Sequence, residues 1–319
     1  MTAFYQATYR WIGGLFIVIF LQGCAGTPQT DRLLSQKPAE LMVPHELTQV
    51  PFFAQQAYQC GPAALATLLQ HQSLSVQPDD LIDRIYLPQR KGSLQVEIVS
   101  ATREYGLIPY LITPELDTLL KEVKAGRPVL VLQNLGVSWY PKWHYAVVIG
   151  YDLPAEKLIL RSGVIKRYVM DLHTFEYTWR RSQSWAMLAL NPGELPVDSD
   201  PWRYLKSIVG FEYLKRWDIL DSAYLAGLAR WPKNRELLMG YGTSQYLQQR
   251  LDIAHFYFSH VILSHPQYAP AHNNLAQVLA EQGDISTALH HAQRAVELGG
   301  VHIEQYQSTL NEIIDKHRQ

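Results

Sequence analysis

A change of pattern near residue 191 constrains this sequence more than any other feature. Before it, helical patterns alternate with short apolar runs, whereas no strand pattern follows it. Helices mixed with strands predict an α+β domain, and the later region predicts an all-α domain. We therefore expect one domain over residues 43–195 and another over residues 196–319, joined by a Pro- and Gly-containing linker. The helical patterns lie at 61–71, 78–86, 94–105 and 115–125, and the strand patterns lie at 129–132, 145–149, 158–160 and 186–190.

A period of 34 residues runs through the second region. Pro232 and Pro266 are 34 positions apart, and Gly300 lies 34 positions further on, each where a helix should end. Small residues recur between these points, and the pattern resembles the tetratricopeptide repeat, in which small residues let paired helices pack closely. Gln245 departs from it, because that position is usually aromatic or apolar. We expect units at 201–234, 235–268 and 269–302 and a closing helix at 303–318; the alternative is an unrelated helical hairpin domain.

Charge and cysteine content exclude several classes of protein. The chain carries 28 Lys and Arg against 29 Asp and Glu, a net charge of −1. A protein that binds nucleic acid through phosphates needs a basic surplus, so we expect no nucleic-acid partner. Two cysteines, Cys24 and Cys60, are too few for a disulfide framework, and each thiol needs its own explanation.

The N-terminus has the features of an export signal. An apolar run from Trp11 to Leu21 is too short to span a bilayer and is followed by Gly23 and Cys24. This ending resembles the lipobox of bacterial lipoproteins, which implies a signal peptide over 1–23, a lipid on Cys24 and a tether over 24–42. Ala25 stands where a retention signal would place Asp, so the resemblance implies a cell-envelope protein anchored to the outer membrane and facing the periplasm. The alternative is a plain signal-anchor helix.

Cys60 is the strongest candidate for a reactive group. It precedes Gly61 and Pro62, and Pro is favoured in the first turn of a helix. The sulfur should therefore lie at a helix N-terminus, where free N–H groups and the helix dipole favour a thiolate.

A reactive thiolate also needs a base and donors for the oxyanion. His144 opens an apolar strand and can face a cleft, where Trp143 beside it would exclude water. Gln55 or Gln56, together with the Cys60 amide, could stabilise the oxyanion.

The motif formed by these residues is specific. Gln-x₄-Cys-Gly-Pro-x₂-Leu followed by His-Tyr-Ala-Val-Val-Ile-Gly-Tyr-Asp resembles the bacteriocin-processing (double-glycine) peptidases, which are papain-fold cysteine peptidases. The resemblance covers about residues 45–190 and implies that Cys60 is the nucleophile, His144 the general base and Gln55 the oxyanion donor. The family's third residue, an Asp or Asn, aligns with Ser162, which has no carboxylate. Asp152, interpreted as a turn residue, and Asn134 are the alternatives nearby.

These features together predict a papain-like cysteine peptidase domain followed by an all-α tetratricopeptide-repeat domain. The expected activity is hydrolysis of peptide bonds in a peptide or protein substrate, with the repeats binding a protein partner and the lipid binding a membrane. An inactive peptidase-like scaffold and an acyl transferase are the alternatives. We expect no cofactor and no metal, and we interpret His272, His290 and His291 as exposed residues on helix faces.

Overall fold

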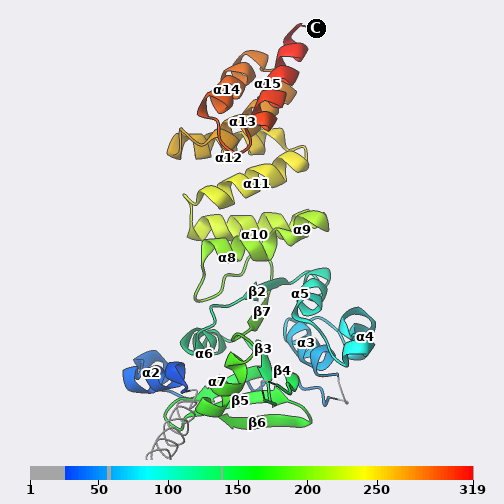
Figure 1. Cartoon of the computed structure of the whole chain (residues 1–319), viewed down its shortest axis with the longest axis vertical. Coiled ribbons are helices and arrows are strands. Elements are labelled where there is room, and N and C mark those ends of the chain that lie inside the picture. Colours follow the sequence, from blue (N-terminus) through cyan, green and yellow to red (C-terminus); the bar gives the residue numbers. More distant parts are fainter. Residues whose placement is uncertain (1–25, 56–58, 138, 319) are drawn as a thin grey trace, which may run out of the picture.

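The structure is a computed structural model that describes residues 26–55, 59–137 and 139–318. An α+β domain forms the lower part of the molecule, and a stack of helices extends from it (Figure 1). This arrangement confirms the predicted fold class.

One antiparallel sheet organises the first domain, with seven strands in the described part of the chain. The order across the sheet is β2-β7-β3-β4-β5-β6, and β1 pairs with β4. Most strands are buried on both faces, which is why they appear in the sequence as continuous apolar runs. The strands are β1 His45–Glu46, β2 Ile108–Leu111, β3 Val129–Asn134, β4 Trp143–Asp152, β5 Lys157–Ser162, β6 Ile165–Asp171 and β7 Ala186–Leu190.

Helices cover both faces of this sheet. Alternate residues of each strand point to opposite sides, so that Leu130 and Val147 face one core while Val131 and Val148 face the other. The first core packs against α3, α4 and α5, and the second against α6 and α7. The helices are α3 Cys60–His71, α4 Asp79–Ile85, α5 Gln95–Glu104, α6 Leu116–Lys124 and α7 Leu172–Arg180, with a 3₁₀ turn at Pro88–Arg90.

All four predicted helices and all four predicted strands of this domain are present. Four further elements, β1, β2, β6 and α7, lacked a clear sequence signal, and β1 has only two residues. β2 is only four residues long and contains Pro109, and β6 is largely exposed, so its residues do not form an apolar run. α7 follows β6 directly and begins with Asp171 as its N-cap.

The expected tether over 24–42 is wrong for most of its length. Residues Pro28–Gln36 form helix α2, and Ala39–Leu41 form a 3₁₀ turn. The amides of Gln29 and Thr30 donate to the buried carboxylate of Glu176, at 3.1 and 2.7 Å, and Leu33 is buried. A carboxylate at a helix N-terminus is stabilised by the helix dipole, so this segment is docked on α7.

The second domain is a stack of helix pairs, whose leading helices begin at residues 201, 235 and 269. Each unit of 34 residues holds two antiparallel helices, and α15 closes the stack. In the first unit the leading helix is broken into α8 and α9, which explains its weak repeat pattern. The helices are α8 Pro201–Ile208, α9 Gly210–Tyr213, α10 Trp217–Arg230, α11 Arg235–Leu247, α12 Leu251–Ser264, α13 Ala269–Gln282, α14 Ile285–Leu298 and α15 Ile303–Arg318.

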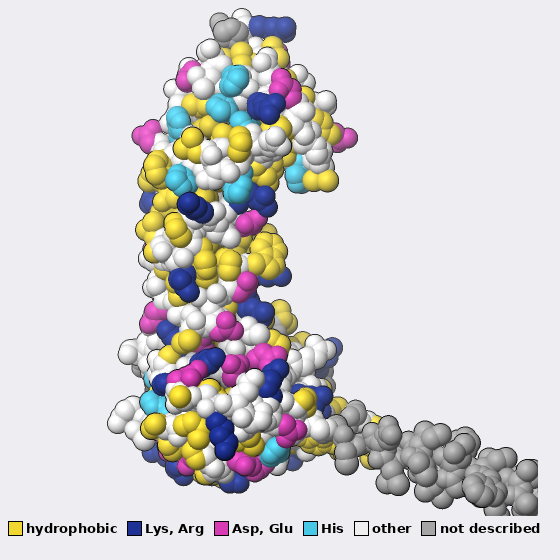
Figure 2. Space-filling model, turned by 90° about the vertical axis from the view of Figure 1, so that its left-hand side faces the viewer, with side chains coloured by type: hydrophobic (Ala, Val, Ile, Leu, Met, Phe, Trp, Pro, Cys, Tyr) yellow, Lys and Arg dark blue, Asp and Glu magenta, His cyan; other side chains and the backbone are white. Residues whose placement is uncertain are grey.

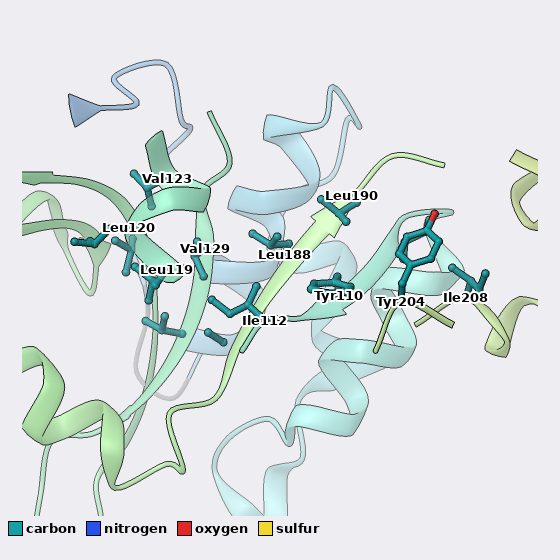
Figure 3. Close-up of a cluster of buried hydrophobic side chains, with 14 of the residues drawn as sticks. Tyr110, Ile112, Leu119, Leu120, Val123, Val129, Leu188, Leu190, Tyr204 and Ile208 are labelled. Atoms are coloured by element: carbon teal, nitrogen blue, oxygen red, sulfur yellow. The ribbon is translucent and has the colours of Figure 1, made fainter. Parts of the chain in front are cut away.

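The two domains share one hydrophobic core. Tyr110 and Ile112 of the sheet side and Tyr204 and Ile208 of α8 belong to the same buried cluster (Figure 3). The linker is fixed as well, because the buried Glu122 accepts a hydrogen bond of 2.7 Å from the Val197 amide. The repeat stack therefore packs directly against the edge of the sheet.

Two polar features of the repeats differ from a simple apolar packing. Gln245 is fully buried and donates to Asp221 at 2.6 Å, while Arg250 binds the same carboxylate. A satisfied polar network thus occupies the position where an apolar side chain was expected. His272 was expected to be exposed and is instead buried, with its Nδ1 2.9 Å from Nδ1 of the half-buried His291. Histidine side chains gather over the repeat helices at the far end of the stack (Figure 2).

Candidate active site

Cys60 is the first residue of α3, as its Gly-Pro sequence predicts. The two residues that follow are buried, and the helix packs its Leu and Ala side chains against β4. Gly61 is required here, because a Cβ atom at this position would lie 2.3 Å from Ser93 Oγ in the segment that leads into α5. This close approach packs the start of α3 against the segment that precedes α5.

The sulfur is not poised as a thiolate, which corrects the expectation from its helix position. Burial raises the pKa of the Cys60 thiol, and this exceeds the opposing effect of the backbone N–H groups of Tyr145, Gly61 and Cys60 itself. Desolvation disfavours the charged form of a thiol, and here it outweighs the dipole and the amides. The resting group is therefore a neutral thiol.

His144 is the second residue of β4 and is half-buried. Its Nε2 lies 2.8 Å from Oγ of Ser162, which fixes the orientation of the ring. Burial, and secondly the positive charge of Lys142, lower the pKa of His144 to about 4. The imidazole is thus neutral near pH 7 and can accept a proton. Within the described residues its Nδ1 forms no hydrogen bond.

The turn between β5 and β6 brings Gln55 to the same place. The backbone N–H of Gln55 donates to the carbonyl of Gly163 at 3.1 Å, and Gly163 follows Ser162 directly. Gln55 is half-buried. The second oxyanion candidate, Gln56, lies outside the described residues.

Hydrogen bonds connect the segments of three of the four predicted site residues, His144, Ser162 and Gln55. The backbone N–H of Tyr145, the residue that follows His144 in β4, lowers the pKa of the Cys60 thiol but does not offset burial. His144 bonds Ser162, and Gly163 beside it bonds Gln55. Between described residues, no hydrogen bond joins the sulfur directly to the ring of His144.

The other two polar candidates serve different purposes. Asp152, at the end of β4, accepts from the Ala155 amide at 3.0 Å and shapes the turn into β5, as the turn interpretation predicts. Asn134 accepts from the amides of Gly136 and Lys142, at 3.0 and 2.8 Å, and so closes the loop before β4. Neither side chain bonds His144.

That loop and the first residue of β4 present aromatic side chains. Trp139, Tyr140 and Trp143 are exposed, by 86%, 73% and 51% respectively. Trp143 was expected to shield the site from water, but at this exposure it provides little cover. Burial of the sulfur comes instead from Tyr145 and the α3 core.

Sequence reasoning missed two groups at this site. The Tyr145 amide carries no sequence signal, because any non-proline residue supplies an N–H. Lys142 lies two residues before His144, so its charge could have been noted from the sequence. In the described ranges, no cluster of three or more His, Cys, Asp or Glu side chains could hold a metal ion.

The predicted lipid site, Cys24, lies outside the described residues. Among the described helices, none combines the length and the apolar content that crossing a membrane requires.

The first domain matches a known family of peptidase-like proteins. Residues 47–187, somewhat less than half of the chain, match the family described as "Peptidase_C39 like family". The matched range holds Gln55, Cys60, His144 and Ser162. The first domain is thus similar to C39 peptidases, and no curated protein matches the chain.

Three solved structures illustrate what the chain is similar to. A C39-like peptidase from Bacillus anthracis is 19% identical, covering 47% of this chain and 98% of that chain, with a TM-score of 0.41. The peptidase domain of Streptococcus ComA, a bifunctional ABC transporter, is 22% identical, covering 45% and 100%, with a TM-score of 0.37. PilF from Pseudomonas aeruginosa is 18% identical, covering 38% and 55%, with a TM-score of 0.35.

Proposed function

We propose that this chain is a lipid-anchored cysteine peptidase of the cell envelope, cleaving a peptide or protein through Cys60 and His144. One relationship carries the proposal. The backbone N–H of Tyr145, the residue that follows His144, acts on the pKa of the Cys60 thiol, and the ring of His144 is oriented by Ser162. A nucleophile, a base and a group that orients the base are what peptide-bond cleavage by a thiol requires.

The pKa directions suggest how the reaction would begin. A raised pKa at Cys60 and a lowered pKa at His144 both describe a neutral pair, so the thiol proton must move as the sulfur attacks. In the tautomer that donates Nε2–H to Ser162, the lone pair of Nδ1 is free to accept that proton. The sulfur then forms a thioester with the carbonyl carbon, and His144 returns the proton to the departing amine. Water, deprotonated by His144, hydrolyses the thioester.

The oxyanion formed in each step needs hydrogen-bond donors. The side-chain amide of Gln55 is one candidate, since its backbone is held at the turn that carries Ser162. The backbone N–H of Cys60 is the other. Removing one such donor typically costs about 10²–10³ in kcat.

The rest of the proposal concerns where in the cell the protein lies and what the repeat domain binds. The apolar segment that ends in Cys24 supports export and lipidation, with the chain facing the periplasm from the outer membrane. The repeat stack supports binding of a protein partner, because helical repeats build extended surfaces.

A second function, a peptidase-like scaffold with little activity, is favoured by specific observations. Ser162 stands where a carboxylate would stabilise the imidazolium, and Cys60 has a raised rather than a lowered pKa. A neutral thiol without a bonded base reacts slowly.

An activity-based thiol probe separates the two functions. Wild type, Cys60→Ala, His144→Ala and Asp152→Asn would be incubated with a peptidyl electrophile and with a peptide library. Under the proposal, labelling and cleavage are lost in the first two variants and retained in Asp152→Asn, whose carboxylate only shapes a turn. Labelling of Cys60 that is slow and indifferent to His144→Ala, with no cleavage, would establish the scaffold instead.

A further inference from the structure

A cleft lies at the junction of the two domains, away from Cys60. Its volume is about 340 Å³, and it is lined by α5 and β2 of the first domain and by α8 of the second. Cys60 packs against the core to which α5 contributes Ile98 and Ala101, whereas Val99 and Arg103 of α5 line the cleft. The cleft is therefore separate from the candidate active site.

Cations dominate the polar groups of this cleft. Among its described lining residues, Arg103, Arg203 and Lys206 face a single carboxylate, Asp200. That carboxylate is already engaged, since it accepts from the Arg203 amide at 2.7 Å as the N-cap of α8. The cleft thus carries positive charge that its own acidic residue does not neutralise.

Two arginine side chains of the cleft have buried nitrogen atoms without a hydrogen-bond partner. The Nε atoms of Arg103 and Arg203 are both buried without a hydrogen-bond partner. Within the described residues the Arg103 side chain forms no hydrogen bond and no ion pair. Its guanidinium lies so close to α9 that a Cβ atom on Gly210 would be 2.7 Å from its Nε. Arg203 has one long bond, 3.4 Å from Nη1 to the Ile112 carbonyl. Buried polar groups are normally satisfied, so these atoms lack a partner.

The walls of the cleft are apolar. Val99, Pro109 and Leu111 line it, and Trp202 is 56% exposed beneath the Lys206 ammonium, which lies 4.9 Å from the ring centroid. A small inorganic anion would satisfy the arginines but would leave these surfaces in water. A ligand with both carboxylates and apolar side chains matches both features.

We propose that this cleft binds an acidic peptide segment that carries apolar side chains between its carboxylates. Carboxylates accept hydrogen bonds from Arg103 and Arg203, a geometry for which guanidinium is well suited. Apolar side chains of the peptide pack on Trp202 and Leu111. The inference does not depend on the chemistry of Cys60, and it concerns a site that an intact or an inactive peptidase would both possess.

Fluorescence anisotropy with the full-length chain tests the proposal. The probe is a fluorescein-labelled peptide of alternating Glu and Leu, and the matched probe has Gln in place of Glu. A Cys60→Ala background prevents cleavage. We expect saturable, salt-sensitive binding of the Glu peptide and at least tenfold weaker binding of the Gln peptide, since each lost charge-assisted bond of about 1.4 kcal/mol is tenfold in Kd.

Variants locate the binding. Arg103→Gln with Arg203→Gln should weaken binding at least tenfold, and the exposed Lys206→Gln, which leaves the buried groups intact, should weaken it several-fold. Lys233→Gln, an exposed position outside the cleft, removes the same charge and should leave Kd unchanged. Equal affinity in the cleft variants and in Lys233→Gln overturns the proposal. Displacement of the peptide by inorganic phosphate at comparable concentration also overturns it, because the cleft would then be a small-anion site.

Discussion

Ser162 Oγ lies 2.8 Å from Nε2 of His144, at the position where a carboxylate would be expected from the similarity to double-glycine peptidases. A hydroxyl orients the imidazole but supplies no negative charge to stabilise its protonated form. Consistent with this, no carboxylate contributes to the lowered pKa of His144, which follows from burial and from Lys142. A carboxylate at position 162 would therefore make His144 a stronger base by opposing the effects of burial and Lys142.

Ser162→Asp should increase the activity of the site. A carboxylate beside the ring should raise the pKa of His144 by roughly 1–3 units, since an opposite charge favours the protonated form. We expect acylation of Cys60 to accelerate about tenfold or more, measured with a peptidyl electrophile and accompanied by an NMR titration of the ring.

Ser162→Ala is the matched control, and it should slow acylation because the ring loses its partner. Unchanged rates in both variants would show that residue 162 has no influence on the base, and Ser162 would then not be a positioning residue.

Alkylation of Cys60 in the resting protein should increase with pH and reach its plateau only above pH 9, because burial raises the pKa of the thiol above its ordinary value of 9.0. The thiolate is the reacting species, and burial favours the neutral thiol. Iodoacetamide labelling between about pH 6 and 10, quantified on the peptide that contains Cys60, measures this directly. A plateau at neutral pH would instead reveal a stable thiolate–imidazolium pair.

The secondary-structure positions of the candidate site residues can be predicted from local sequence, but their pKa values cannot. The Gly-Pro pair after Cys60 determines a helix start, and the apolar run after His144 determines a strand. The pKa of the thiol depends on how deeply the start of α3 is buried against Tyr145, which is a property of packing between segments 85 residues apart. The tether was mispredicted for a similar reason, because the buried Glu176 that holds α2 lies far along the chain.

Gly61→Ala should destabilise the start of α3. A Cβ atom would lie 2.3 Å from Oγ and 2.7 Å from Cβ of Ser93, so the segment before α5 would have to move. Overpacking of this kind costs about 1–3 kcal/mol, which urea denaturation can measure. Ser93→Gly removes both opposing atoms, and the double variant should recover most of the loss. Failure of the double variant to recover would locate the strain elsewhere.

Lys142→Gln should raise the pKa of His144 from about 4 while leaving it below the ordinary value of 6.5. The Lys142 charge is the smaller of two causes, and burial remains in the variant. The backbone bond from Lys142 to Asn134 does not involve the side chain, so the loop should stay in place. NMR titration of the ring gives the pKa. Lys124→Gln on α6 removes an equal charge from an exposed position and should leave it unchanged.

The paired histidines of the repeats should make stability depend on pH below neutrality. His272 Nε2 donates to the Pro266 carbonyl at 3.1 Å, so its Nδ1 accepts from Nδ1 of His291 at 2.9 Å. Burial, and then the neighbouring His272, lower the pKa of His291 to about 4, and the pKa of His272 is lowered as well. Between pH 6.5 and about 4 the unfolded chain therefore binds more protons than the folded chain, and the free energy of unfolding falls as pH decreases through this window.

Thermal unfolding across that window, followed for the wild type and for His291→Asn, checks this pair. The variant removes the group with the larger shift, and its Tm should fall less steeply between about pH 6.5 and 4. His302→Asn is the control, because His302 is an exposed histidine that follows α14, and it should retain the wild-type slope. Parallel slopes in all three proteins would mean that the titration of this pair does not control the acid stability of the repeat stack.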